Sequence, residues 1–138
     1  MVKILRLSDR IKLSIGEISF MLAPLSNDIK REIAGCSTIK NGESIFDYAM
    51  AQHVYIKNSV KDISGVETYG GETYKLHFEG DKLTDECVSD IFNLQQKGIL
   101  VSCAWQLLNG IPDKLTDDNG KPLKGVQLDV IPQGSHTG

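Results

Sequence analysis

The chain has 138 residues, of which 41% are hydrophobic and 24% are charged, as expected for a single globular domain. Its net charge of −3, with a pI near 5.6, argues against general nucleic-acid binding, which usually requires a basic surface. No apolar run approaches the roughly 20 residues of a membrane span, and we expect no signal peptide. The three cysteines have no CxxC spacing and are expected to be reduced, as in a cytoplasmic protein.

The N-terminal region predicts a β-hairpin followed by a short helix. Apolar and polar residues alternate on either side of a Gly-Glu turn, so we expect residues 10–15 to pair with residues 18–23. Ser26 is a suitable N-cap and Gly35 a suitable C-cap, which predicts a helix between them. The mostly polar residues 37–42 are expected to form a loop.

A longer helix is predicted over residues 44–58, with Ser44 as its N-cap. Its apolar stripe has helical spacing and includes Phe46, Met50 and Val54. This stripe predicts that one side of the helix faces the core or a partner.

Residues 60–94 contain the clearest local pattern in the chain. Residues 60–67 favour a strand, and Gly70 and Gly71 favour a tight turn. Residues 74–79 alternate between apolar and polar types, which predicts a half-buried strand. Thr84 then caps a predicted helix. The buried face of this helix is expected to contain Cys87, Val88, Ile91, Phe92 and Leu94.

This stretch is also acidic. Eight acids against three lysines give residues 60–94 a charge of −5, whereas seven basic residues against four acids give residues 1–40 a charge of +3. The two segments are candidates for attraction to each other or to a partner, and a solvated mixed surface is the simpler alternative. Four of the acids are expected to form an acidic rim: Glu79, Asp81, Asp85 and Glu86.

The most hydrophobic segment predicts a final helix over residues 99–108, which contains Trp105. After this helix the composition becomes polar. We therefore predict an α+β domain over residues 1–112, in which antiparallel β-hairpins pack against three to four helices. Residues 113–138 are expected to form a polar C-terminal segment that is partly extended or disordered.

Within that segment, residues 126–130 alternate in polarity and predict one short strand. Residues 132–138 are expected to be disordered unless a partner holds them. The Asp-Asp-Asn-Gly sequence at 117–120 superficially resembles a calcium loop, but Leu115 and Val126 stand where its acidic ligands belong. We interpret it as a turn.

We find no phosphate-binding glycine loop, GxSxG motif or metal-ligand cluster, and the three histidines are scattered. Cys87 or Cys103 paired with His53 is an open alternative as a nucleophilic site, although buried structural cysteine is preferred. The acids between residues 79 and 90 are a further alternative, as a catalytic carboxylate pair. The expectation is a non-enzymatic protein without catalytic residues, a metal ion or a cofactor.

The run YKLHFEGDKLTDECVSDIFNL followed by AWQLLNGIPD resembles small tailed-phage and prophage proteins of the tail assembly chaperone class. The resemblance covers residues 59–113 and also includes the SVKDISGVE strand. It implies a protein of the bacterial cytoplasm that binds the tape-measure protein, keeps it soluble and helps recruit tail-tube subunits. Many such chaperones exist in a short form and a frameshifted long form.

A chaperone for an amphipathic helix needs an apolar groove with a polar rim. The candidate groove residues are Phe46, Met50, Val54, Ile91, Phe92 and Trp105, with core packing as the alternative for each. Two other functions remain open: a structural virion or tail-associated phage protein, and an acidic inhibitor of a host defence protein. The chain is also a candidate for self-association, and no nucleic acid or membrane partner is expected.

Overall fold

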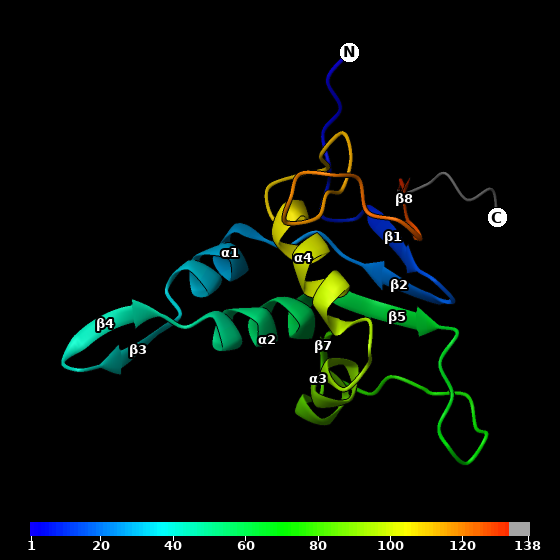
Figure 1. Ribbon diagram of the computed structural model, residues 1–138, viewed down its shortest axis with the longest axis horizontal. Helices are drawn as coiled ribbons and strands as arrows, with labels where there is room; N and C mark the ends of the chain where they lie inside the picture. Colours follow the sequence, from blue (N-terminus) through cyan, green and yellow to red (C-terminus); the bar gives the residue numbers. More distant parts are fainter. Residues whose placement is uncertain (133–138) are drawn as a thin grey trace.

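The computed structural model describes residues 1–132, which fold around a four-stranded antiparallel sheet (Figure 1). The order of the strands across the sheet is β5-β2-β1-β8. The fold class is therefore α+β, as predicted. The four strands are β1 (Arg10–Ile15), β2 (Ile18–Leu22), β5 (Val60–Ser64) and β8 (Val126–Ile131).

The predicted N-terminal hairpin is confirmed. β1 and β2 pair in antiparallel register, with Leu13 opposite Phe20, and β8 pairs with the other side of β1, with Leu128 opposite Leu13. Every second residue of β1 and β2 is buried, because side chains alternate between the two faces of a strand. The outer face is polar, and on it the hydroxyls of Ser14 and Ser19 lie 3.0 Å apart.

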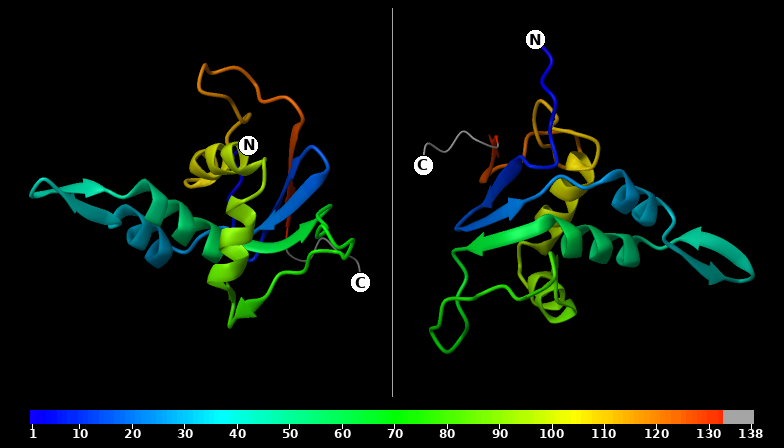
Figure 2. Two further views of the ribbon diagram at one scale, coloured as in Figure 1. Left: turned by 60° about the horizontal axis from the view of Figure 1, so that its bottom comes forward. Right: turned by 180° about the vertical axis from the view of Figure 1, so that it is seen from behind.

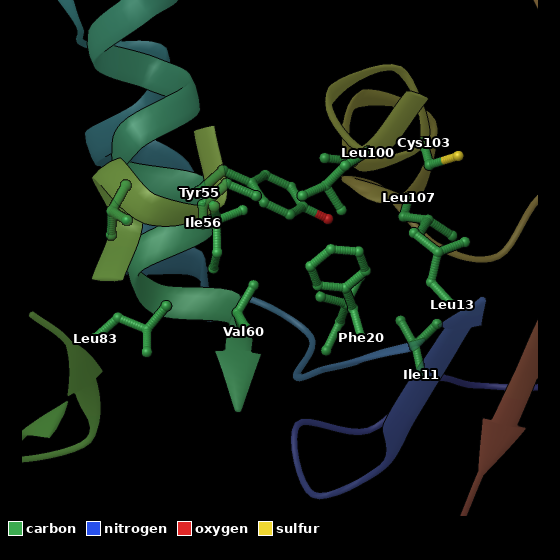
Figure 3. Close-up of a cluster of buried hydrophobic side chains, with 14 of the residues drawn as sticks. Ile11, Leu13, Phe20, Tyr55, Ile56, Val60, Leu83, Leu100, Cys103 and Leu107 are labelled. Carbon is green, nitrogen blue, oxygen red and sulfur yellow. The ribbon is translucent and has the colours of Figure 1, made fainter. Parts of the chain in front are cut away.

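Helices cover the inner face of the sheet and complete the core. In Figure 3, Leu100, Cys103 and Leu107 of α4 face Leu13 and Phe20 of the sheet. α2 leads directly into β5, so its last turns also reach this core (Figure 2). The helices are α1 (Asn27–Ala34), α2 (Tyr48–Ser59), α3 (Asp85–Phe92) and α4 (Lys97–Leu107).

Side-chain caps fix the start of three helices. Ser26 and Thr84 accept hydrogen bonds from backbone N–H groups in the first turns of α1 and α3, as predicted. The predicted start of α2 is wrong. Asp47, and not Ser44, is its N-cap, because residues 43–46 are already held in a strand.

Residues 37–46 form a second hairpin, although residues 37–42 were predicted to be a loop and residue 44 to begin a helix. β3 (Ser37–Lys40) pairs with β4 (Glu43–Phe46), and the two strands project away from the body between α1 and α2 (Figure 1). Asn41 and Gly42 both have positive φ, which is the requirement of a tight hairpin turn. The Asn-Gly pair was therefore the overlooked signal for this hairpin.

The expected strand over residues 74–79 is mostly absent. Only β6 (Phe78–Glu79) pairs, with β7 (Lys82–Leu83). The preceding residues lie against α3, where the backbone N–H of His77 donates to Cys87 Sγ at 3.2 Å. The sequence alternation persists as alternating burial, but no neighbouring strand pairs with residues 74–77.

The chain after residue 112 belongs to the same folding unit, so the predicted division at this point needs correction. Leu115 is buried in the common core, and β8 is part of the main sheet, which confirms the predicted strand at 126–130. Gln106 of α4 holds the connection: its amide accepts from Thr116 N at 2.9 Å and donates to Thr116 O at 2.8 Å. Residues 133–138, where disorder was predicted, lie outside the described residues.

Candidate functional site

Three aromatic rings from separate elements meet at the base of the projecting hairpin. Phe46 ends β4, Tyr48 begins α2 and Trp105 lies on α4. Their ring centroids are 4.8 Å apart for Phe46 and Tyr48 and 6.3 Å apart for each pair that includes Trp105. These separations and tilted orientations are favourable for aromatic pairs. We call Phe46, Tyr48 and Trp105 the aromatic cluster.

The aromatic cluster is partly open to solvent: Phe46 and Trp105 are half-buried and pack against the core, and exposed apolar side chains lie beside them. Tyr48 is 65% exposed, and Ile39 of the hairpin is 71% exposed. Ile39 and Phe46 share one face of the hairpin, because Ile39 pairs with Ser44 and Ser37 pairs with Phe46. A gathering of exposed apolar side chains of this kind is typical of an interaction site.

A small apolar cleft continues from Trp105 along the contact between α2 and α4. It is the place where the two helices leave surface that neither fully covers. Its lining residues are Gln52, Tyr55, Ile56, Val101, Ala104 and Trp105. This cleft has a volume of only about 10 Å³, enough for one small group, so the aromatic cluster is the part of this surface that can accept an apolar stripe from a partner.

The structure divides the predicted groove residues. It brings Phe46 and Trp105 together, and it leaves Met50 exposed and Val54 half-buried on α2. Ile91 is only 1% exposed, so it is a core residue and cannot line a groove.

Phe92 lies on α3, where Lys97 Nζ is 5.3 Å from its ring centroid. It therefore belongs to a different surface from the aromatic cluster. Sequence reasoning missed Tyr48 and Ile39, because the helix start was placed too early and the hairpin was interpreted as a loop.

The predicted acidic rim occupies the β6–β7 turn and the first turn of α3. All four of its acids, Glu79, Asp81, Asp85 and Glu86, are exposed. Asp85 links α3 to α2: its Oδ1 accepts from Lys57 Nζ at 2.6 Å and lies 3.0 Å from His53 Nε2. The hydrogen bond from Lys57, followed by the one from His53, lowers the pKa of Asp85. His53 is therefore occupied in a helix–helix contact.

We expect Asp85→Asn to lower the urea denaturation midpoint near neutral pH, because it weakens the link to Lys57 and His53. These contacts hold the pKa of Asp85 below its ordinary value of 3.8, so their stabilisation is present above that value. It is lost as the pH falls through the depressed pKa, and the difference between variant and wild type should then shrink. Midpoints measured across an acid pH series test this.

Glu86→Gln is the matched control, because Glu86 is the next carboxylate in the same helix turn and has a similar relation to the helix dipole. An equal loss in both variants would show that the dipole alone explains the effect.

The cysteines are buried, and the contacts around them are structural. Cys87 Sγ accepts the backbone N–H of His77, and burial raises the pKa of Cys103 to about 11. Burial is also the main cause of the raised pKa of Cys36. A thiol with a raised pKa is largely protonated at neutral pH and is a poor nucleophile.

The turn at 117–120 is held by the side chain of Asp117. Asp117 Oδ1 accepts the N–H groups of Asn119 and Lys121, each at 2.9 Å. Across residues 1–132, no three His, Cys, Asp or Glu side chains gather in a group that could hold a metal ion. In the same part of the chain, no helix has the length and apolar character needed to cross a membrane.

Comparison with known proteins adds no relative. No family model matches the chain, and neither a curated protein nor a solved structure matches it.

Proposed function

We propose that this protein is a non-enzymatic phage tail assembly chaperone, which binds the tape-measure protein in the bacterial cytoplasm and helps recruit tail-tube subunits. The observation that carries the proposal is the partly exposed aromatic cluster of Phe46, Tyr48 and Trp105 at the base of the projecting hairpin. The resemblance of residues 59–113 to tail assembly chaperones supplies the partner.

The physical basis is recognition of an amphipathic helix by an apolar surface. Such a helix presents anchors at i, i+3, i+4 and i+7, and aromatic residues in the receptor usually carry most of the binding energy. Here the anchors would contact the aromatic cluster. These residues are held by secondary structure, so little ordering is required on binding.

The projecting hairpin also supports a role in binding a partner. A two-stranded hairpin without further packing is marginally stable in water, and all of β3 together with most of β4 is exposed. Contact with a partner would bury Ile39, which lies on the same face as Phe46. We therefore assign the hairpin as a second arm of the binding surface.

We expect Trp105→Ala to weaken binding of a helical tape-measure fragment by roughly 30-fold, since loss of a central aromatic anchor costs about 2 kcal/mol or more. Affinity is measured by isothermal titration calorimetry with the purified protein and fragment. Co-expression with the wild-type protein should also raise the solubility of the fragment. Tyr48→Ala is a second variant; its ring is mostly exposed, so the fold should be preserved.

Phe92→Ala is the matched control, because Phe92 is a half-buried aromatic residue on α3, outside the aromatic cluster. An equal loss of affinity in Phe92→Ala and Trp105→Ala would show that the binding surface includes α3 or that both variants are generally destabilised. Failure of the wild-type chain to form any complex with the fragment would remove the proposal. Recovery of the protein in purified phage particles would instead indicate a structural subunit, because an assembly chaperone leaves before maturation.

A further inference from the structure

Residues 1–8 lead away from the body of the protein, and we call them the N-terminal arm (Figure 1). Residues 7 and 8 form a turn, and Leu5 packs partly against the core. The arm carries the basic residues Lys3 and Arg6 among apolar ones. Met1, Val2, Ile4 and Leu7 are all largely exposed, with Ile4 at 83%. The backbone N–H of Arg6 donates to Asp9 Oδ2 at 2.7 Å, which fixes the point where the arm leaves β1. The arm therefore presents uncovered apolar surface together with positive charge.

A hollow of about 710 Å³ lies between α3 and the chain at residues 68–77, and this volume is in the range of ligand-binding sites. Three carboxylates line it, those of Glu72, Glu86 and Asp90, together with Lys75 and His77. Tyr74 also lines it and donates a hydrogen bond to Asp90 Oδ2 at 2.7 Å. The hollow thus combines a net negative charge with an aromatic residue in its lining. We call it the acidic hollow.

The arm and the acidic hollow lie at opposite ends of the molecule. In Figure 1 and in the right view of Figure 2, the N-terminus is at one end, and α3 and the neighbouring loop are at the other. The attraction between the basic and acidic segments that the sequence suggests therefore cannot be satisfied by these two features within one chain. The arm of one copy can, however, reach the acidic hollow of a second copy.

We propose that the N-terminal arm of one copy binds in the acidic hollow of a second copy. Lys3 and Arg6 pair with the carboxylates of Glu72 and Glu86, and the apolar residues of the arm cover the ring of Tyr74. Since the two surfaces differ, the contact is head to tail, and a pair of copies keeps one free arm and one free hollow. The association therefore extends into a chain or closes into a ring, and it weakens with salt.

The first test is the mass of the full chain in solution, measured by sedimentation velocity over a concentration series. At about 0.1 M salt, where charges act over about 10 Å, the average mass should rise with concentration above the 15.2 kDa of one chain. At about 1 M salt, charges act over only about 3 Å, and the average mass should return toward that of the monomer. A chain that stays monomeric at low salt overturns the proposal.

The second test uses charge reversal on each side of the contact. The arm variant Lys3→Glu/Arg6→Glu and the hollow variant Glu72→Lys/Glu86→Lys should each be monomeric alone. An equal mixture should associate again into chains or rings, because the unchanged arm of the hollow variant fits the unchanged hollow of the arm variant, and the reversed arm fits the reversed hollow. Combining all four changes in one chain should restore extended association.

Lys124→Glu and Glu17→Lys are the controls for the change of net charge, since both residues are exposed and lie outside the arm and the hollow. Circular dichroism at the same salt verifies that each variant is folded. Persistent association of either double variant, or a mixture that remains monomeric, overturns the proposal. The inference is separate from client binding: Trp105→Ala should leave the mass unchanged, so failure of one proposal does not remove the other.

Discussion

Replacing Phe20 with alanine is expected to lower the free energy of unfolding by about 3–5 kcal/mol. Phe20 has no exposed surface and lies in β2, with Leu13 opposite on β1 and Ile63 opposite on β5. Figure 3 shows its ring between the sheet and the helices that cover it. This loss has two parts: the ring no longer buries apolar surface, and a cavity remains in its place. Since a domain of this kind is stable by only about 5–15 kcal/mol, the variant should be close to unfolding.

Urea denaturation followed by circular dichroism measures this loss, and Met21→Ala is the matched control. Met21 is the next residue of β2 and points to the outer, polar face of the sheet. Its truncation should cost less than about 1 kcal/mol, in line with substitutions away from the core. Equal losses at Phe20 and Met21 would contradict the assignment of the two faces.

Gly65→Ala is expected to cost at least about 2 kcal/mol, because two penalties coincide at this position. Gly65 has φ +83, a conformation that L residues rarely adopt. A Cβ at this position would also lie 2.0 Å from the backbone carbonyl oxygen of Glu17, in the β1–β2 turn. A backbone atom cannot rotate away, so the turn or the end of β5 must move.

Gly71→Ala separates these two penalties. Gly71 has φ +87, but a Cβ there would meet nothing within 4 Å. Only the backbone strain of about 1–2 kcal/mol applies. Urea midpoints of the two variants should therefore differ clearly, with Gly65→Ala the less stable. Equal midpoints would show that the close approach between Gly65 and Glu17 does not contribute.

The elements that the sequence predicted correctly depend on neighbouring residues. The β1–β2 hairpin follows from period-two alternation around Gly16, and α1 and α3 begin at the expected caps, Ser26 and Thr84. Strand β8 was recognised from the same alternation. Each of these signals acts over a few residues, so it is fully contained in the local sequence.

Some errors occurred where tertiary contacts overrode the local pattern, whereas the β3–β4 hairpin was missed although its Asn-Gly turn signal is local. Residues 74–77 alternate like a strand but lie against α3, with His77 bonded to Cys87. The N–H of Tyr74 donates to Val66 O at 2.9 Å, but no continuous ladder runs along these residues, so no strand forms. Residues 44–46 have helical apolar spacing but are paired in β4. A local pattern favours a strand or a helix, but the structure that forms depends on which other segments are available for pairing or packing.

The candidate site was also predicted only in part from local signals. The sequence identified Phe46 and Trp105 as apolar residues that core packing or a partner would cover, but it placed them in one set with Ile91, which is buried in the core. Only the fold brings Phe46, Tyr48 and Trp105 together, because they lie on separate elements with up to 59 positions between them. Contacts at such separation are not encoded in any short window.

The sequence by itself determined that the chain is α+β, where most of its elements begin and end, and that its charge is divided between a basic and an acidic region. Only the tertiary structure decided the strand order β5-β2-β1-β8 and the inclusion of the C-terminal segment in the main sheet. It also placed the N-terminal arm and the acidic hollow at opposite ends. Local preferences arise from backbone and side-chain sterics within a few residues, whereas these decisions depend on burying apolar surface between residues far apart in the chain.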